Sequence, residues 1–246
     1  MRLVPQFRCR ALRAVSVLRG ALAVSLIAVV VHSFGSAFPN FGLAQTASQQ
    51  TERRKTSTPY KGDLSIFENS DRDKKLQVER VMDILRIREG SDVADVGAGS
   101  GWFTMRAAKR VRDQGRVYAV DINPDAIHYI DDRVQREGMR NIHTILSTED
   151  DPKLPANSVD AVLILKTYHE IAEPVRLLEN LRKSLRHGAR VGIIDRNGNG
   201  EDHGVQQDVV EREAARAGYL LVEHYDFVKA DREDYFLVFE LEREHH

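Results

Sequence analysis

The residues from Val93 to Arg110, VADVGAGSGWFTMRAAKR, combine three glycines with an acid. Gly97, Gly99 and Gly101 alternate with small residues, and Asp95 lies two positions before the first of them. Glycines let the backbone turn sharply and approach a ligand closely, while the start of a helix offers free N–H groups. The stretch therefore predicts a ligand-binding turn. The alternative is a tight strand-to-helix turn that binds nothing.

A second acid, Asp121, lies 22 residues after Gly99, at the end of the apolar run VYAVD. A carboxylate at the tip of the neighbouring strand can accept hydrogen bonds from two ribose hydroxyls. Its alternative role is to cap the helix that begins at Pro124, but Asn123 is better placed for that. A dinucleotide-binding fingerprint would need its third glycine at position 102, where this chain has Trp102. The spacing therefore disfavours a nicotinamide-dinucleotide loop.

Strand and helix patterns alternate along the chain after residue 90. Strands are predicted at 92–96, 115–122, 141–146, 158–165, 189–195, 219–227 and 234–241. Helices are predicted at 71–87, 101–111, 124–138, 174–188 and 205–218. The short connection between the last two strands favours an antiparallel hairpin at the sheet edge. The predicted fold class is α/β, a doubly wound, Rossmann-like sheet of seven mostly parallel strands, with ligands bound outside the strand C-termini.

Four segments of the chain resemble the successive motifs of a known family. They are VADVGAGSGWFT, VYAVDINPDAI, LPANSVDAVLI and LRHGARVGIID. They look like the motifs of class I S-adenosylmethionine-dependent methyltransferases, and most of all the small-molecule branch that includes quinone-biosynthesis and arsenite methyltransferases. The resemblance extends from about Val78 to Leu241. It implies an enzyme that transfers a methyl group from S-adenosylmethionine to a small-molecule acceptor.

The same resemblance implies which residues bind the cofactor. The three glycines would hold its methionine portion, Asp95 would orient their loop and meet the amino group, and Asp121 would hold the ribose with Ile122 beside the adenine. Relatives often carry Gly-Asp-Ala after the third strand, whereas this chain has STEDDP. A threonine aligns with that aspartate, so Glu149 and Asp150 are the candidates for contact with the adenine amino group. A solvated acidic loop is the alternative.

Methyl transfer from a sulfonium is an in-line displacement, for which the protein mainly aligns the nucleophile with the methyl group. We expect substrate-binding residues where the fourth strand ends, in LILKTYHEI, and these are Tyr168, His169 and Glu170. His169 is the favoured general base, needed only if the acceptor must lose a proton, because an unperturbed imidazole titrates near neutral pH. The alternative is that His169 packs structurally. His203, in a polar Gly-rich loop, is a weaker second candidate.

Composition argues against several other chemistries. The chain has one cysteine, Cys9, so it has no disulfide framework, and its body lacks the thiolates of typical arsenite methyltransferases. No Cys/His cluster has zinc spacing, and no metal site is predicted. No Asn/Asp-Pro-Pro-aromatic motif follows the fourth strand, so methylation of base or glutamine amino groups is not indicated. The formal charge of -1 gives no basic footprint for nucleic acid.

The first 44 residues differ from the rest of the chain. They hold five arginines and no acid, and the apolar run ALAVSLIAVVV precedes several small residues. This pattern predicts a signal peptide cleaved after Ala44, or else a retained membrane anchor over 20–38. An organelle transit peptide is a further alternative. The polar stretch 45–69 is predicted to be a linker, and 70–246 the methyltransferase domain.

The leader predicts an exported, periplasmic or membrane-anchored protein, or a cytoplasmic one if the start codon is set too early. Without the leader the domain is acidic, so we expect a neutral or cationic acceptor. Because S-adenosylmethionine is made in the cytoplasm, an exported domain that binds it without catalysis is the alternative function. A nicotinamide-dependent oxidoreductase is the third.

Overall fold

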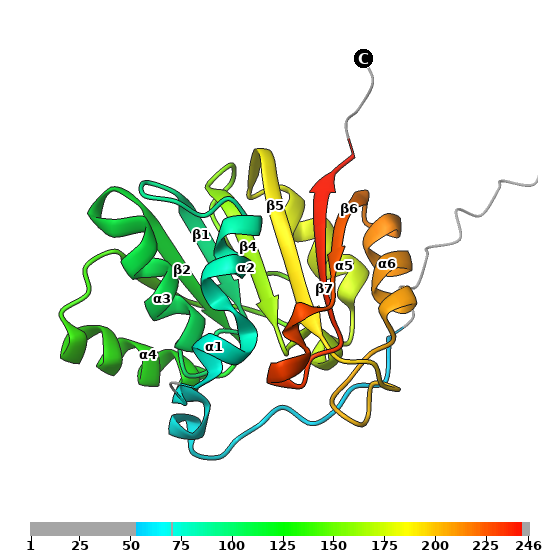
Figure 1. Cartoon of the computed structure of the whole chain (residues 1–246), viewed down its shortest axis with the longest axis horizontal. Coiled ribbons are helices and arrows are strands. Elements are labelled where there is room, and N and C mark those ends of the chain that lie inside the picture. Colours follow the sequence, from blue (N-terminus) through cyan, green and yellow to red (C-terminus); the bar gives the residue numbers. More distant parts are fainter. Residues whose placement is uncertain (1–52, 70, 243–246) are drawn as a thin grey trace, which may run out of the picture. The chain divides into compact units, whose positions relative to one another are not determined.

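The computed structural model describes residues 53–69 and 71–242. In this part of the chain seven strands form one sheet in the order β3-β2-β1-β4-β5-β7-β6 (Figure 1). The strands are β1 (Asp92–Val96), β2 (Arg116–Asp121), β3 (Ile142–Leu146), β4 (Val159–Leu165), β5 (Leu185–Asp195), β6 (Tyr219–Tyr225) and β7 (Tyr235–Leu241). β1 to β5 run parallel, and β7 lies antiparallel between β5 and β6. The predicted fold class and its antiparallel edge hairpin are confirmed.

Helices cover both faces of this sheet. The α-helices are α1 (Arg72–Leu76), α2 (Val78–Ile84), α3 (Trp102–Val111), α4 (Pro124–Glu137), α5 (Pro174–Arg182) and α6 (Gln207–Arg216). The 3-10 helices are η1 (Leu64–Glu68), η2 (Arg112–Gln114), η3 (Tyr168–Glu170) and η4 (Phe227–Asp231). One apolar core joins the sheet to α2, α3 and α4, and a second joins it to α5 and α6. Both faces of the central strands are therefore buried, as their near-continuous apolar sequences require, whereas the outer strands β3 and β6 are more exposed.

The helix predicted over 71–87 is broken, which corrects the expectation of one continuous element. Gln77 has a φ of 53°, in the left-handed region, and its N–H bonds to carbonyls of the preceding turn. This conformation ends α1 and redirects the chain into α2, whose Val81 and Met82 are buried in the core.

The helix predicted over 174–188 also ends early, so Gly188 is not its cap. α5 stops at Arg182, because the carbonyl of Ser184 already accepts the N–H groups of Ser158 and Val159 at 2.8 and 3.0 Å. Those bonds start the pairing of β5 with β4, and Gly188, with a φ of 74°, lies within the irregular first part of β5.

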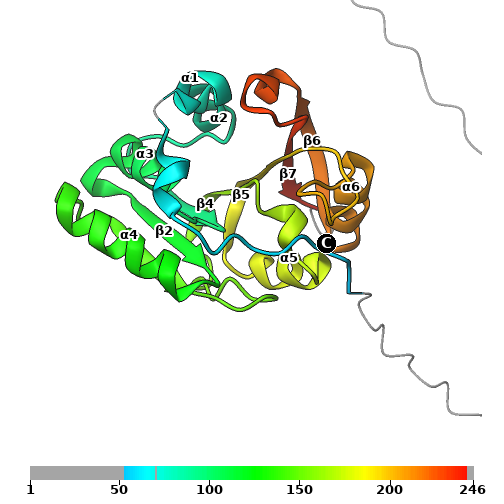
Figure 2. The same cartoon turned by 90° about the horizontal axis from the view of Figure 1, so that it is seen from below.

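The segment 53–69 crosses the edge of the sheet at which β1, β2, β4 and β5 end (Figure 2). Arg54 fixes one end of this segment. Its guanidinium donates to the carbonyls of Tyr168 at 2.5 Å and Ile171 at 3.0 Å, and pairs with Glu213 at 2.8 Å. The predicted linker thus contains residues that pack on the sheet edge, while the predicted boundaries at 44/45 and 69/70 stay predictions.

The predicted signal peptide or anchor over 1–44 lies outside the described residues. Within 53–69 and 71–242, the helices are all too short or too polar to cross a bilayer.

Candidate functional site

The glycine loop follows β1 and leads directly into α3. Gly97, Gly99 and Gly101 have φ angles of 76°, 54° and 72°, which residues with side chains rarely adopt. A Cβ on Gly97 would lie 2.2 Å from the Thr167 side chain, so this glycine permits close packing against the end of β4. A Cβ on Gly99 would meet nothing within 4 Å, so open space lies beside this part of the loop.

Asp95 is a buried carboxylate that fixes the start of α3. Its Oδ2 atom accepts the N–H of Thr104 at 3.0 Å and the Thr104 hydroxyl at 2.6 Å. Only 2% of Asp95 is exposed, and this burial raises its pKa to about 6 although the bonds from Thr104 oppose the shift. The carboxylate thus holds the helix N-terminus against the glycine loop.

Asp121 ends β2 and holds the same loop from the other side. Its two oxygens accept the N–H of Gly99 at 2.8 Å and the N–H of Asn123 at 2.9 Å. Burial raises the pKa of Asp121. Asn123, not Asp121, caps α4 by accepting the N–H of Asp125, as expected from the sequence. Ile122, 46% exposed, follows at the rim.

The two acids after β3 pair with arginines. Glu149 lies 2.7 Å from the guanidinium of Arg53, and both side chains are more than half exposed. Asp150 pairs with Arg176 at 3.0 Å. Because Ser147 donates its N–H to the carbonyl of Asp121, the loop that carries both acids starts beside the predicted ribose site. Their contact with the adenine stays a prediction.

The end of β4 separates the three residues predicted to bind substrate. Tyr168 is fully buried in the core on the α5 and α6 side, and its hydroxyl lies 3.0 Å from Glu213. Its side chain therefore does not meet those of His169 and Glu170. The Nε2 atom of His169 lies 3.9 Å from Oε1 of Glu170, and burial raises the pKa of this glutamate.

His169 is oriented by Asp195, the last residue of β5. Its Nδ1 lies 2.8 Å from Oδ1 of Asp195, a fully buried carboxylate that also accepts the N–H groups of His169 and Arg196. Nδ1–H donates to this carboxylate, which leaves Nε2 with a free lone pair. We did not predict Asp195 from the sequence, although it ends the apolar run ARVGIID just as Asp121 ends VYAVD.

His169, Glu170 and His203 also form a possible metal-ligand group among the described residues. One ligand atom from each lies within 4.8 Å of the others, and the two imidazole rings meet edge to face at 5.8 Å. These three residues match none of the zinc spacings of cysteine and histidine, so the sequence did not predict this group. The Nε2 atom of His169 can therefore bind either a proton or a metal cation.

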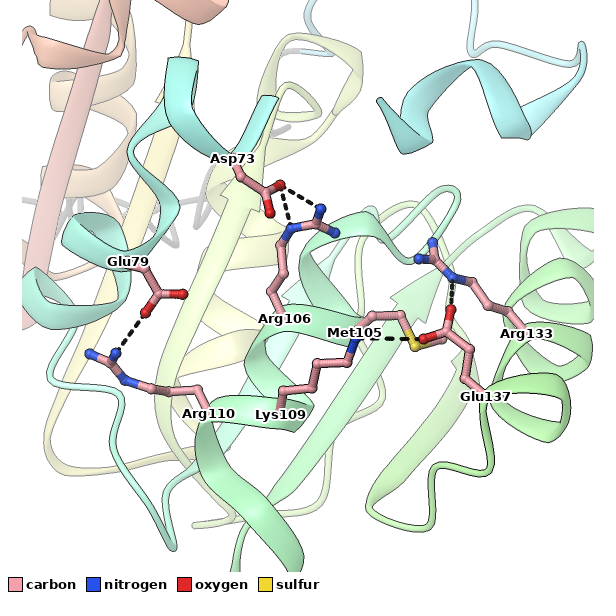
Figure 3. Close-up of a pocket in the computed structure, with 8 residues that line it drawn as sticks. All are labelled: Asp73, Glu79, Met105, Arg106, Lys109, Arg110, Arg133 and Glu137. Carbon is pink, nitrogen blue, oxygen red and sulfur yellow. Dashed lines mark hydrogen bonds and ion pairs between the residues drawn. The ribbon is translucent and has the colours of Figure 1, made fainter. Parts of the chain in front are cut away.

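A separate hollow of about 590 Å³ lies between α3 and the helices α1, α2 and α4 (Figure 3). All of its charged side chains form ion pairs. Arg106 pairs with Asp73, Arg110 with Glu79, and Arg133 with Glu137. We assign no ligand to this hollow, because its lining residues come from helices rather than from the strand ends that carry the acids and histidines.

Comparison with known proteins identifies the fold and the class. Residues 93–188 match the model of a methyltransferase domain family. An aklanonic acid methyltransferase of Streptomyces sp. (strain C5) is 31% identical over 46% of this chain and 52% of its own length. A ubiquinone/menaquinone biosynthesis C-methyltransferase of Hydrogenovibrio crunogenus is 27% identical over 49% and 48%. The chain thus spans about half the length of the curated relatives it matches.

Solved structures share the fold. A SAM-dependent methyltransferase from Aquifex aeolicus superposes with a TM-score of 0.66 at 24% identity, over 73% of this chain and 98% of that one. The [4+2]-cyclase SpnF superposes with a TM-score of 0.59 at 13% identity, over 78% and 87%. Because a cyclase has the same fold, the fold alone does not fix the reaction.

Proposed function

We propose that this protein is a class I methyltransferase that transfers a methyl group from S-adenosylmethionine to a small-molecule acceptor. The match of residues 93–188 to a methyltransferase domain family supports this. One observation carries the proposal. The glycine loop, Asp121 and the Asp195–His169 pair come from four different strand ends and lie at one edge of the sheet. This is where ligands bind in doubly wound sheets.

The residues at this edge fit the cofactor. The glycine loop has open space beside Gly99, and each oxygen of Asp121 holds one N–H and keeps a lone pair for a hydroxyl group. On the family's pattern, the glycines and Asp95 would bind the methionine portion and Asp121 the ribose. Ile122 would lie against the adenine, with Glu149 or Asp150 at its amino group.

When bound, S-adenosylmethionine supplies a methyl group on a sulfonium, so the carbon–sulfur bonding pair stays on sulfur as the acceptor's lone pair forms the new bond. Nε2 of His169 accepts the acceptor's proton where the acceptor must lose one. Asp195 keeps Nδ1 protonated and stabilises the imidazolium that results, as a buried carboxylate does in other acid–histidine pairs. Glu170 lies at the same point and can orient the acceptor.

Calorimetry followed by turnover measurements tests this function. We expect S-adenosylmethionine and S-adenosylhomocysteine to bind the full chain and NAD to show no binding. Preferential binding of NAD would assign the oxidoreductase instead. A screen of quinols, phenols and thiols then measures release of S-adenosylhomocysteine. Cofactor binding without turnover on any acceptor would favour the non-catalytic alternative.

We further propose that the first 44 residues direct export or membrane attachment. The basic start and apolar run support this proposal. Cell fractionation with mass spectrometry of the mature N-terminus tests it. A mature chain that begins at Gln45 would establish cleavage, whereas an uncleaved soluble chain in the cytoplasm would exclude export.

A further inference from the structure

A hollow of about 320 Å³ opens beside the end of β4, between η1, α1 and the segment that contains η4. Its lining includes two apolar side chains, four cations and one acid: Ile66, Phe67, Arg72, Lys75, Lys166, Arg232 and Asp231. We call this hollow the cationic chamber. The segments that line it lie at the same end of the sheet as the strand termini (Figure 2).

The cationic chamber adjoins the proposed methyl-transfer site on two sides. Lys166 is followed by Thr167, whose side chain packs against Gly97 of the glycine loop. The guanidinium of Arg72 lies over the ring of Trp102, the residue that follows Gly101, at 4.5 Å from the ring centroid. A molecule in the chamber would therefore contact residues that adjoin the glycine loop and the end of β4.

The positive charge of this chamber is only partly neutralised. Arg72 pairs with Asp231 at 3.0 Å, and Lys166 pairs with Glu233 at 2.5 Å. Lys75 and Arg232 form no ion pair with any described residue. Two of the four cations thus have no counter-charge, and the chamber favours an anion.

Lys166 is positioned by an ion pair with a buried glutamate, Glu233. Glu233 is only 1% exposed. Among the described residues, Lys166 is the single cation that pairs with its carboxylate. Lys166 itself has a φ of 56°, an uncommon conformation for a residue with a long side chain. The ammonium group keeps further N–H donors for a ligand, since it carries three.

The apolar part of the chamber comes from η1. Ile66 is 57% exposed and Phe67 is 37% exposed, so both offer apolar surface that no described residue covers. Apolar surface beside unpaired cations matches a molecule with an apolar body and an anionic group.

We propose that the methyl acceptor is an aromatic carboxylate that binds in this chamber, with its ring against Ile66 and Phe67 and its carboxylate bound by Lys75, Arg232 and Lys166. This inference rests on the proposed function, because it names the substrate class of that site. It differs from the neutral or cationic acceptor expected from the net charge, because local charges act on a bound ligand more strongly than distant, screened ones.

Two probes of equal shape test the proposal. We titrate 4-hydroxybenzoate and 4-hydroxybenzamide into the full chain saturated with S-adenosylhomocysteine. Both carry a ring and a phenol, but only the first is an anion. We expect the benzoate to bind about tenfold or more tightly than the benzamide, since hydrogen bonds to charged groups are roughly twice as strong as neutral ones. Higher salt should reduce this preference.

Neighbouring lysines of α1 supply a matched control. Lys75→Glu should abolish the preference for the benzoate, whereas Lys74→Glu, which changes the net charge equally on the same short helix but does not line the chamber, should keep it. Arg232→Asn, which removes a charge at a φ of 69° that asparagine tolerates, should also abolish it. Thermal unfolding midpoints show that the variants are folded.

Several outcomes would overturn the inference. These are equal affinity for both probes, no binding of either at millimolar concentrations, or the same effect from Lys74→Glu as from Lys75→Glu. A failure of the proposed function looks different, because S-adenosylhomocysteine would then not bind. The affinities of the benzoate and the benzamide can still be compared in the absence of S-adenosylhomocysteine.

Discussion

The Nδ1 atom of His169 lies 2.8 Å from a carboxylate oxygen of Asp195, and neither side chain is more than 5% exposed. Asp195 ends β5, whereas His169 lies in η3, the short helix that follows β4, and the two residues are 26 positions apart in the sequence. The same carboxylate also accepts the backbone N–H of His169, so Asp195 fixes both the position and the tautomer of the imidazole. As a consequence, Nε2 of His169 is free to accept a proton from a bound acceptor.

Replacing His169 should affect turnover far more than cofactor binding. With an acceptor that must lose a proton, His169→Ala should lower kcat by roughly 10²–10⁴-fold, as loss of a positioned base does. Asp195→Asn should also lower kcat, because the imidazolium loses its counter-charge. S-adenosylhomocysteine affinity, measured by calorimetry, should stay unchanged in both. Wild-type kcat in a folded His169→Ala protein would remove this residue from the chemistry.

Zinc should inhibit the enzyme by binding at Nε2 of His169. Glu170 and His203 supply the two further ligand atoms, so His203→Ala should weaken the inhibition. His187→Ala, at an exposed histidine of β5 outside this group, is the matched control and should leave it unchanged. Kinetic inhibition curves measure the effect. Loss of activity with a chelator, restored by a divalent cation, would instead make the group a metal centre.

Asp121 should contribute to cofactor affinity, whereas its neighbour Asn123 should contribute to stability alone. Asp121→Ala removes the acceptor proposed for the ribose and should weaken S-adenosylhomocysteine binding by about 1–3 kcal/mol. Asn123→Ala removes the cap of α4 and should lower the free energy of unfolding by about 1 kcal/mol without changing affinity. Calorimetry and denaturant titration separate the two. Equal affinities of the two variants would refute the ribose assignment.

Two glycines with similar backbone conformations allow a test of whether the glycine loop binds a ligand or is only a structural turn. Gly99 and Gly138 have φ angles of 54° and 67°, and a Cβ on either would meet nothing within 4 Å. Valine at either position should cost about 1–2 kcal/mol or more of stability, because it resists a positive φ. Only Gly99→Val should also abolish cofactor binding, since its side chain would enter the open space beside the loop. Normal binding by that variant would show that the loop is a structural turn.

The fold could be predicted because its signals are local. Apolar runs, glycines at positive φ and the cap at Asn123 each act over a few residues, and both Asp95 and Asp121 lie beside the loop where spacing put them. Residues that meet only through tertiary contact were missed. Asp195 reaches His169 across the β4–β5 pair, and Glu233 reaches Lys166 from the start of β7. The hydrophobic periodicity of the sequence does not predict either contact.

Two boundary errors have the same origin. The periodic apolar residues of 71–87 suit one helix, but Gln77 adopts a left-handed conformation that ends α1 and precedes α2. Gly188 matched a helix cap in the sequence, yet pairing of Ser184 with the start of β4 had already ended α5. In both cases tertiary packing overrode a valid local signal.

Ionisation of Asp95 should lower stability as pH rises. Burial raises its folded pKa from 3.8 to about 6, so between these values the folded state binds a proton that the unfolded state has released. The free energy of unfolding should therefore fall with rising pH across this window, by about 3 kcal/mol for this group. Asp95→Asn keeps both bonds from Thr104, because one oxygen accepts them both, and should remove this part of the pH dependence.

Cofactor affinity should change in the opposite direction over the same window. The resemblance assigns Asp95 to the cationic amino group of S-adenosylmethionine, and only the ionised carboxylate attracts a cation. Affinity for S-adenosylhomocysteine, which keeps this amino group, should therefore rise as pH increases through about 6 and then level off. Asp95→Asn should bind more weakly above this pH and lose the rise. Calorimetric titrations at a series of pH values give both curves. If affinity depended on pH in the same way in the wild type and the variant, Asp95 would not contact the amino group. Its role would then be limited to its hydrogen bonds with Thr104.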